Sequence, residues 1–204
     1  STLLASSAAS DVYKRQRYML CLKVRNTWKE VAPNEEAEII LIDTSKKEDD
    51  RERIRSLAKT NAWNVQQGCM LQWLGPDFDE KIIYNDFRNG KFCSIILNIK
   101  SMREKILKVP IYTVNSDGKS ALTLDFTRLH SLRPGYGYSN KIEETKGIPL
   151  PDKTCIWKIN LENGEIQPFL KPKLYESTHV RVGISTAYSR RLGNCQLWTY
   201  KRYV

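Results

Sequence analysis

Short apolar runs alternate with short polar turns from about residue 69 to residue 170. Runs of about 4–8 residues that are rich in β-branched and aromatic side chains are typical of β-strands. Eight such runs are predicted as strands: Cys69–Leu74, Lys81–Phe87, Phe92–Ile99, Lys105–Pro110, Ile111–Val114, Ser120–Phe126, Cys155–Leu161 and Glu165–Leu170. The pattern therefore predicts an all-β protein.

The links between these runs have the chemistry of tight turns. They include Gly75-Pro76-Asp77, Arg88-Asn89-Gly90, Asn115-Ser116-Asp117-Gly118 and Glu162-Asn163-Gly164. Asn-Gly and Asp-Gly pairs tolerate the positive φ that hairpin turns require, so neighbouring strands should be antiparallel. The stretch Ile82-Ile83-Tyr84 is apolar on both sides of a strand, which predicts a sheet that is covered on both faces.

The runs also repeat along the chain. A strand, a turn, a lysine and a second strand occur in residues 70–87 and again in 111–126, with Lys81 and Lys119 in corresponding places. Asp43, Asn98 and Asn160 each follow a similar apolar run. Four antiparallel strands in about 40–45 residues are typical of a propeller blade. The predicted fold is a partial β-propeller of about two and a half to three four-stranded antiparallel blades.

The predicted organisation is a partial blade over 18–66, a blade over 67–108, and a blade over 109–172 that carries a long loop, Leu129–Lys153. A closed ring needs about four to eight blades, so further blades are expected beyond the ends of this sequence. Residues 48–59 leave two interpretations open. Ser45 and Glu48 form a capping box that favours a helix, whereas the repeat favours an outer strand.

The two ends of the chain do not follow the repeat. The segment SAASDVYKRQ resembles the translated read-through of a sequencing adapter in environmental DNA, so residues 1–17 are treated as artefactual or disordered. Residues 173–204 have no strand–turn rhythm, and either a true terminal segment or a frameshift would explain them.

The turn Asn-Ser-Asp-Gly-Lys-Ser-Ala-Leu at residues 115–122 resembles the turn of bacterial WD-like β-propeller repeats. Residues 63–74, 80–86 and 125–138 resemble bacterial propellers related to the oligogalacturonate lyase family. The resemblance covers roughly residues 35–172 and implies a propeller fold. It also implies that a metal site of histidine and glutamine side chains would lie mostly on blades outside this sequence. No catalytic or metal-binding residue is assigned here, and the cofactor is left open.

A net charge of +10 is typical of proteins that bind nucleic acid. The distribution of the charges argues against this function. Residues 31–170 carry 20 basic and 20 acidic side chains, so the surplus lies in the two ends. Neither nucleic acid nor a membrane is therefore expected as a partner. The five cysteines show no C-x-x-C spacing, which favours buried thiols and a cytoplasmic location, with the periplasm as an alternative.

The first candidate site is the loop that follows the strand ending near residue 126. It contains Arg128, His130, Arg133, Tyr136 and Tyr138. Arginine binds carboxylates with two parallel hydrogen bonds, and tyrosine stacks on sugar rings, so this set suits an acidic oligosaccharide. The alternative is that the arginines pair with local acids and the tyrosines pack the loop.

The second candidate site is residues 63–68, before a predicted inner strand. Asn64, Gln66 and Gln67 could hydrogen-bond sugar hydroxyls, or they could satisfy backbone groups at the strand end. The predicted function is binding of an acidic, oligouronide-like carbohydrate. An oligogalacturonate-type lyase and a non-catalytic protein-interaction scaffold are the alternatives, and whether the chain is an enzyme stays open.

Overall fold

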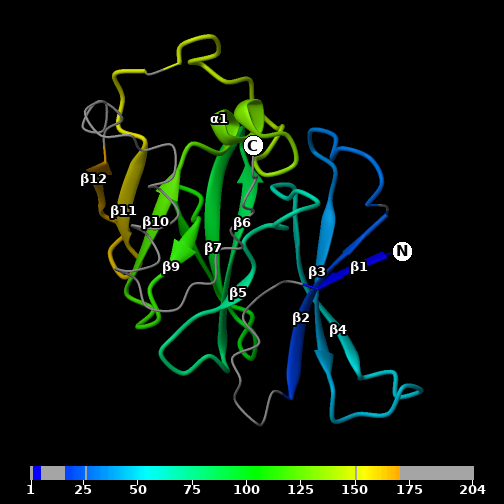
Figure 1. Ribbon diagram of the computed structural model, residues 1–204. Helices are drawn as coiled ribbons and strands as arrows, with labels where there is room; N and C mark the ends of the chain where they lie inside the picture. Colours follow the sequence, from blue (N-terminus) through cyan, green and yellow to red (C-terminus); the bar gives the residue numbers. More distant parts are fainter. Residues whose placement is uncertain (1, 6–16, 26, 150, 171–204) are drawn as a thin grey trace, which may run out of the picture.

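The computed structural model describes residues 2–5, 17–25, 27–149 and 151–170. These residues form three four-stranded sheets, and each sheet consists of consecutive strands (Figure 1). The first contains β1 (Thr2–Ala5), β2 (Tyr18–Val24), β3 (Ala37–Asp43) and β4 (Ile54–Thr60). The second contains β5 (Gln72–Trp73), β6 (Lys81–Arg88), β7 (Lys91–Asn98) and β8 (Glu104–Leu107). The third contains β9 (Thr113–Val114), β10 (Ser120–Leu124), β11 (Ile156–Asn160) and β12 (Ile166–Leu170).

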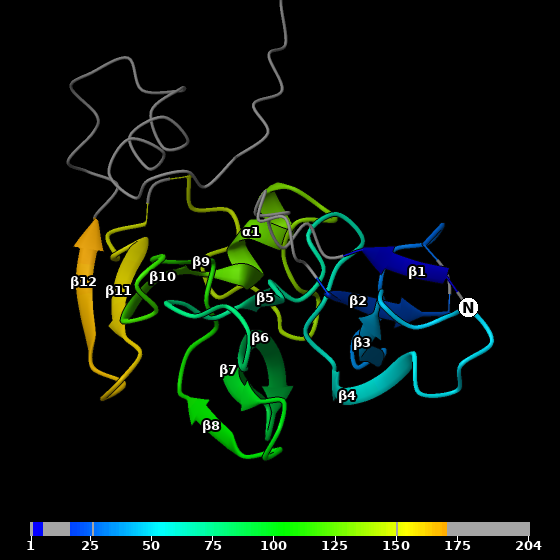
Figure 2. The ribbon, with the colours of Figure 1, turned by 90° about the horizontal axis from the view of Figure 1, so that it is seen from below.

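Every pair of neighbouring strands within a sheet is antiparallel. Seen from below, the sheets fan out side by side, with β5 and β9 toward the middle and β8 and β12 toward the outside (Figure 2). Sequential four-stranded meanders arranged in this way are the blades of a partial β-propeller. The predicted fold class is therefore confirmed.

The first sheet differs from the partial blade expected over residues 18–66. Thr2–Ala5 pairs with β2 from Thr2–Val24 to Ala5–Cys21, so the segment excluded from the fold supplies an edge strand. Residues 6–16 and 173–204 lie outside the described residues, and so do the expectations stated for them.

Of the two interpretations left open for residues 48–59, the structure matches the outer strand, because Ile54–Thr60 pairs with β3 and follows the repeat. The segment after β10 is not a plain loop. It begins with a helix, α1 (Phe126–Leu132), whose N-cap Asp125 accepts hydrogen bonds from the backbone of Thr127 and Arg128.

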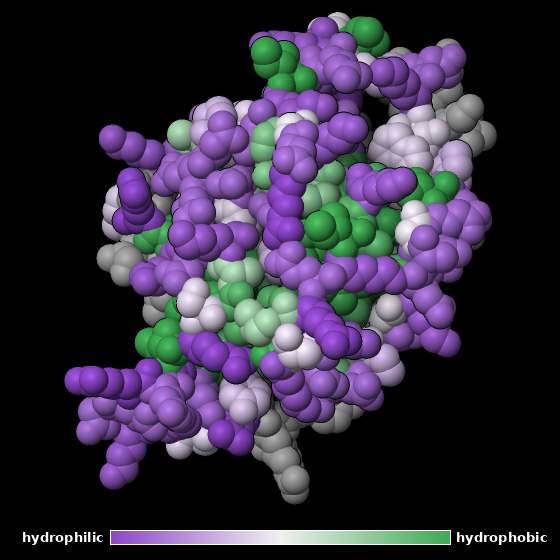
Figure 3. All heavy atoms as spheres, turned by 180° about the vertical axis from the view of Figure 1, so that it is seen from behind, coloured by the Kyte–Doolittle hydropathy of each residue, from purple (hydrophilic) through white to green (hydrophobic). Residues whose placement is uncertain are grey.

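The core lies between the sheets. Ile82 and Tyr84 of β6 pack with the first sheet, whereas Ile83 packs with the third. The middle sheet is therefore covered on both faces, as the run Ile82-Ile83-Tyr84 predicts. On the rear face of the molecule, hydrophilic side chains dominate and hydrophobic ones show between them (Figure 3).

The outer hairpins of the second and third sheets have the same turn. The backbone N–H of Asn98 donates to Arg103 O, and that of Asn160 donates to Glu165 O. Each asparagine also accepts from two backbone N–H groups of its turn through Oδ1. Asp43 accepts from Ser45 N at the matching end of β3. The predicted correspondence of these three residues is thus confirmed in their hydrogen bonding.

The inner hairpin turns of the second and third sheets touch through their backbones. Gly118 has φ of 69°, and a Cβ there would lie 2.0 Å from Gly75 O. A Cβ on Gly75 would lie 2.0 Å from Ser116 O. Neither position has room for a side chain, so these two glycines set how closely the turns approach.

Candidate functional site

The loop that carries the first candidate residues folds back onto α1. Tyr138 N donates to Phe126 O over 3.2 Å, which brings the end of the loop to the start of the helix. Gly137 makes this approach possible, because a Cβ there would lie 2.2 Å from Phe126 O and from His130 N. The candidate side chains therefore surround α1, at the upper end of the sheets in Figure 1.

The guanidinium group of Arg128 is hydrogen-bonded to residues of this loop. Its guanidinium lies 2.7 Å from Glu143 Oε1 and also donates to Thr145 Oγ1 and to the carbonyl oxygens of Ile148 and Pro149. The pKa of Glu143 lies below its usual range because Ser131, Thr145 and Arg128 all hydrogen-bond to the carboxylate. The geometry matches the alternative in which an arginine pairs with a local acid.

Tyr138 is fully buried and does not face a ligand. Its ring stacks on Phe126 with centroids 4.4 Å apart, and its hydroxyl accepts a hydrogen bond of 2.9 Å from Asn85 Nδ2. Burial raises the pKa of the Tyr138 phenol well above its ordinary value. Tyr138 thus packs the loop against the middle sheet.

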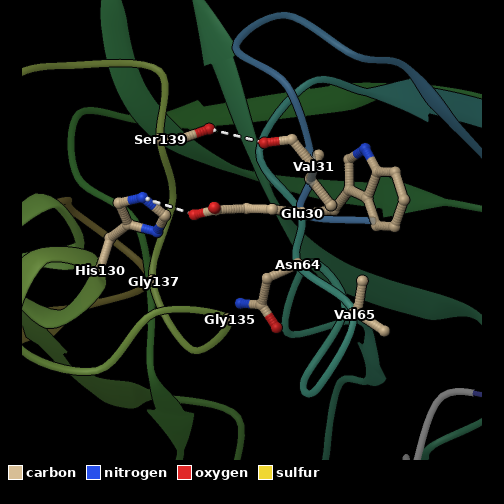
Figure 4. A pocket seen from close by; sticks show the side chains of 9 residues that line it. Glu30, Val31, Asn64, Val65, His130, Gly135, Gly137 and Ser139 are labelled. Atoms are coloured by element: carbon tan, nitrogen blue, oxygen red, sulfur yellow. Dashed lines mark hydrogen bonds and ion pairs between the residues drawn. The ribbon is translucent and has the colours of Figure 1, made fainter. Parts of the chain in front are cut away.

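His130 and Asn64 meet at a narrow cavity between α1, residues 30–31 and residues 63–65 (Figure 4). His130 Nε2 lies 3.2 Å from Glu30 Oε1. Asn64 accepts from the backbone of Gln66 and Gln67 and donates to Tyr136 O over 3.1 Å. The cavity has about 20 Å³, enough for one water molecule, so a sugar ring does not fit.

The two glutamines differ in their surroundings. Gln66 is exposed, and its Cγ lies beside Gly135. Gln67 is partly buried, and its Nε2 donates to Tyr112 Oη over 3.3 Å. Its Oε1 is buried and has no partner within the described residues. Only Gln66 therefore presents a free amide to solvent.

Arg133 is exposed and Tyr136 is partly buried. The guanidinium carbon of Arg133 lies 3.8 Å from the centroid of the Tyr136 ring, a stacked cation–π contact. Because Gly135 and Asn64 join this loop to residues 64–67, Gln66 lies on the same side. We call Gln66, Arg133 and Tyr136 the Arg133 patch. The structure thus joins the two candidate segments through these three side chains.

A larger cavity of about 200 Å³ lies at the start of α1, and sequence reasoning missed it. Its lining comes from β7, the link before β9, the β10–α1 junction and the loop after α1, and consists of Phe92, Pro110, Leu124, Asp125, Phe126, Thr127, Lys141, Ile142 and Glu144. Lys141 and Glu144 belong to no motif. Asp125 belongs to the range 125–138 that resembles propeller repeats, and this range was the only sequence signal near the cavity.

The remaining chemistry-bearing residues form no metal site within the part of the chain that the structure describes. Four described cysteines are free thiols: Cys21, Cys69 and Cys93 are buried, and Cys155 is partly buried. Burial raises the pKa of Cys93 to about 11, which fits its predicted role as a small core residue. Among the same described residues, no helix has the length and apolar character needed to cross a bilayer.

The comparisons with known proteins give no family. No family model matches the chain, and no curated protein matches it. The resemblance to oligogalacturonate lyases and the adapter origin of the first residues therefore find no support there.

Two solved structures are similar in part. TolB from Acinetobacter baumannii shares 11% identity over 74% of this chain, with a TM-score of 0.43. The apo form of the AtxE2 isopeptidase shares 11% identity over 84%, with a TM-score of 0.42. The match spans 29% of each of those proteins.

Proposed function

We propose that this propeller segment recognises a carboxylated oligosaccharide at the Arg133 patch, without catalysing its conversion. The observation that carries the proposal is the stack of Arg133 on Tyr136 at 3.8 Å. Arg133 is exposed and makes no ion pair within the described ranges, in contrast to Arg128. Its charge is therefore available to an outside partner.

The stack suits a carboxylate ligand. A guanidinium that lies flat on an aromatic ring keeps its N–H groups in one plane, and these edges form two parallel hydrogen bonds with a carboxylate. Gln66 adds an amide that can both donate to and accept from a sugar hydroxyl. Because the neighbouring cavity has room for about one water, the ligand would lie along the surface as an extended chain.

The two other functions have weaker support. The lyase function rests on the sequence resemblance alone, and the Arg133 patch contains no general base. A protein-interaction scaffold would use exposed apolar side chains, of which Trp28 and Leu132 are 88% and 68% exposed. Leu132 directly precedes Arg133, but Trp28 belongs to neither candidate segment, so a substitution of Trp28 distinguishes the scaffold from carbohydrate recognition.

Calorimetric titration with trigalacturonate and with neutral maltotriose tests the proposal. The acidic trisaccharide should bind and the neutral one should not. Arg133→Ala should weaken binding about tenfold or more, since a hydrogen bond to a charged group contributes about 1.5–3 kcal/mol. Arg103→Ala removes another exposed arginine, on the turn between β7 and β8, and serves as the control.

Equal affinity of the parent chain and Arg133→Ala would overturn the proposed site. Release of an unsaturated product from trigalacturonate would instead favour the lyase. A partner protein whose binding is lost in Trp28→Ala and kept in Arg133→Ala would favour the scaffold.

A further inference from the structure

The larger cavity combines charges of both signs with an apolar floor. We call it the Lys141 cavity. Lys141, Asp125 and Glu144 supply the charges, and Phe92 and Phe126 are among the apolar residues. Its volume of about 200 Å³ corresponds to several water molecules, so it has room for a ligand of about ten non-hydrogen atoms.

The apolar floor is fixed by packing. Phe126 is 1% exposed and is stacked on Tyr138. Phe92 lies between two further rings, with centroids 4.9 Å from Phe87 and 5.5 Å from Tyr138. Side chains held in this way cannot collapse into the space, so the cavity is formed before any ligand arrives.

The charged groups keep capacity for a ligand. Asp125 accepts from Thr127 N, Thr127 Oγ1 and Arg128 N, all through Oδ1, which leaves Oδ2 without a partner among the described residues. The same bonds occupy the backbone N–H groups at the start of α1, so the helix end offers no anion site.

The two charged residues of the loop are also available. Lys141 makes no ion pair within the described chain. Glu144 reaches Lys153 at 3.6 Å, but both side chains are more than half exposed, so this ion pair is weak. Both residues can therefore change partners when a ligand enters.

We propose that the Lys141 cavity binds a small zwitterion, namely a free α-amino acid with an apolar side chain. The ligand carboxylate pairs with Lys141, its ammonium group lies against Asp125 and Glu144, and its side chain packs against Phe92 and Ile142, which are among the apolar lining residues with accessible surface. An anionic sugar is disfavoured because two carboxylates line the space. A divalent cation is disfavoured because the positively charged Lys141 side chain lines the same cavity. This site is separate from the Arg133 patch.

Saturation-transfer NMR and calorimetry with L-leucine test this site. Leucine should bind saturably, whereas isoamylamine, which lacks the carboxylate, and N-acetyl-leucine, which lacks the ammonium charge, should each bind at least tenfold more weakly. Glycine should also bind more weakly, because it has no side chain for the floor. The series thus checks each contact in turn.

Variants locate the site on the protein. Lys141→Met and Glu144→Gln should each weaken leucine binding at least tenfold, whereas Lys146→Met, which changes an exposed lysine of the same loop outside the lining, should not. Amide spectra of each variant check that the fold is kept. Absence of saturable leucine binding, or unchanged binding in both cavity variants, overturns the proposal. Isoamylamine binding as tightly as leucine overturns the role of Lys141.

Discussion

The side-chain amide of Asn85 exchanges two hydrogen bonds with the backbone of Ile111, each 2.7 Å long. Asn85 is fully buried on β6, and Ile111 lies in the link that leads to the third sheet. The same amide reaches the hydroxyl of Tyr138, and the main-chain oxygen of Asn85 accepts from Thr60 Oγ1 of the first sheet. One residue therefore joins all three sheets and the candidate loop.

Asn85→Leu should destabilise the protein by at least about 3 kcal/mol. The substitution leaves the N–H and C=O of Ile111 and the Tyr138 hydroxyl buried without their partner, and each such group costs roughly 1–3 kcal/mol. Urea unfolding followed by tryptophan fluorescence measures the change. Gln167→Ala on the exposed strand β12 should stay within about 0.5 kcal/mol of the parent. A loss below 1 kcal/mol for Asn85→Leu would contradict the prediction.

Gly118→Ala should destabilise more than Gly90→Ala does. Both glycines have positive φ, at 69° and 72°, so the backbone strain is shared. A Cβ on Gly118 would meet Gly75 O at 2.0 Å, whereas nothing lies within 4 Å of one on Gly90. Gly90→Ala should cost about 1–2 kcal/mol from strain alone. Equal unfolding midpoints for the two variants would show that the turns move apart at no cost.

Met102→Gly should stabilise the protein by about 1 kcal/mol. Met102 has φ of 58° and is 46% exposed, so it has the strain of the left-handed region and little burial to offset it. In the matching turn of the third sheet this place is held by Gly164, with φ of 77°. Gly164→Met should have the opposite effect. Thermal unfolding of both variants gives the two signs.

Stability should depend on Asp43 in acid. The Arg17 and Ser45 hydrogen bonds hold the pKa of this carboxyl far below its ordinary value. A lowered pKa in the folded state means that the contribution is complete above the unfolded value, near 4, and is lost as the pH falls toward the folded value. The urea midpoint should therefore fall less between pH 5 and pH 3 in Asp43→Asn than in the parent. Identical slopes would show that the pair contributes nothing.

Tyr136→Leu should weaken trigalacturonate binding, and Tyr136→Phe should preserve it. The stack on Arg133 uses the face of the ring, which phenylalanine keeps and leucine lacks. The comparison separates positioning of the guanidinium from any hydrogen bond of the hydroxyl. A loss in Tyr136→Phe equal to that in Tyr136→Leu would assign the effect to the hydroxyl instead. Calorimetry on both variants decides this.

Much of the fold could be predicted because it depends on local patterns. The run Ile82-Ile83-Tyr84 predicts a doubly covered strand, and the Asn98 and Asn160 repeat predicts equivalent hairpins, since both depend on neighbouring residues. Helix α1 was missed because a segment of seven residues is too short to show a helical repeat of apolar residues, although Asp125 is a strong N-cap.

The candidate site was harder to predict because its side chains take partners that are distant in sequence. Arg128 pairs with Glu143, 15 residues away in a loop without periodicity, and Tyr138 reaches Asn85 across 53 residues. Arg133 and Tyr136 are three residues apart, so the sequence indicates that they can stack. Whether the stack is accessible to a ligand depends on how the loop folds. The Lys141 cavity draws on four separate segments, which no local pattern brings together.

The matching turns at Asn98 and Asn160 make the outer hairpin of a blade an exchangeable part. Each turn is held by its own asparagine and spans the same five-residue step, from Asn98 to Arg103 and from Asn160 to Glu165. A peptide inserted into either turn would therefore be anchored by the same set of asparagine hydrogen bonds. The rim of the protein thus offers two equivalent insertion points for displayed sequences, both remote from the Arg133 patch.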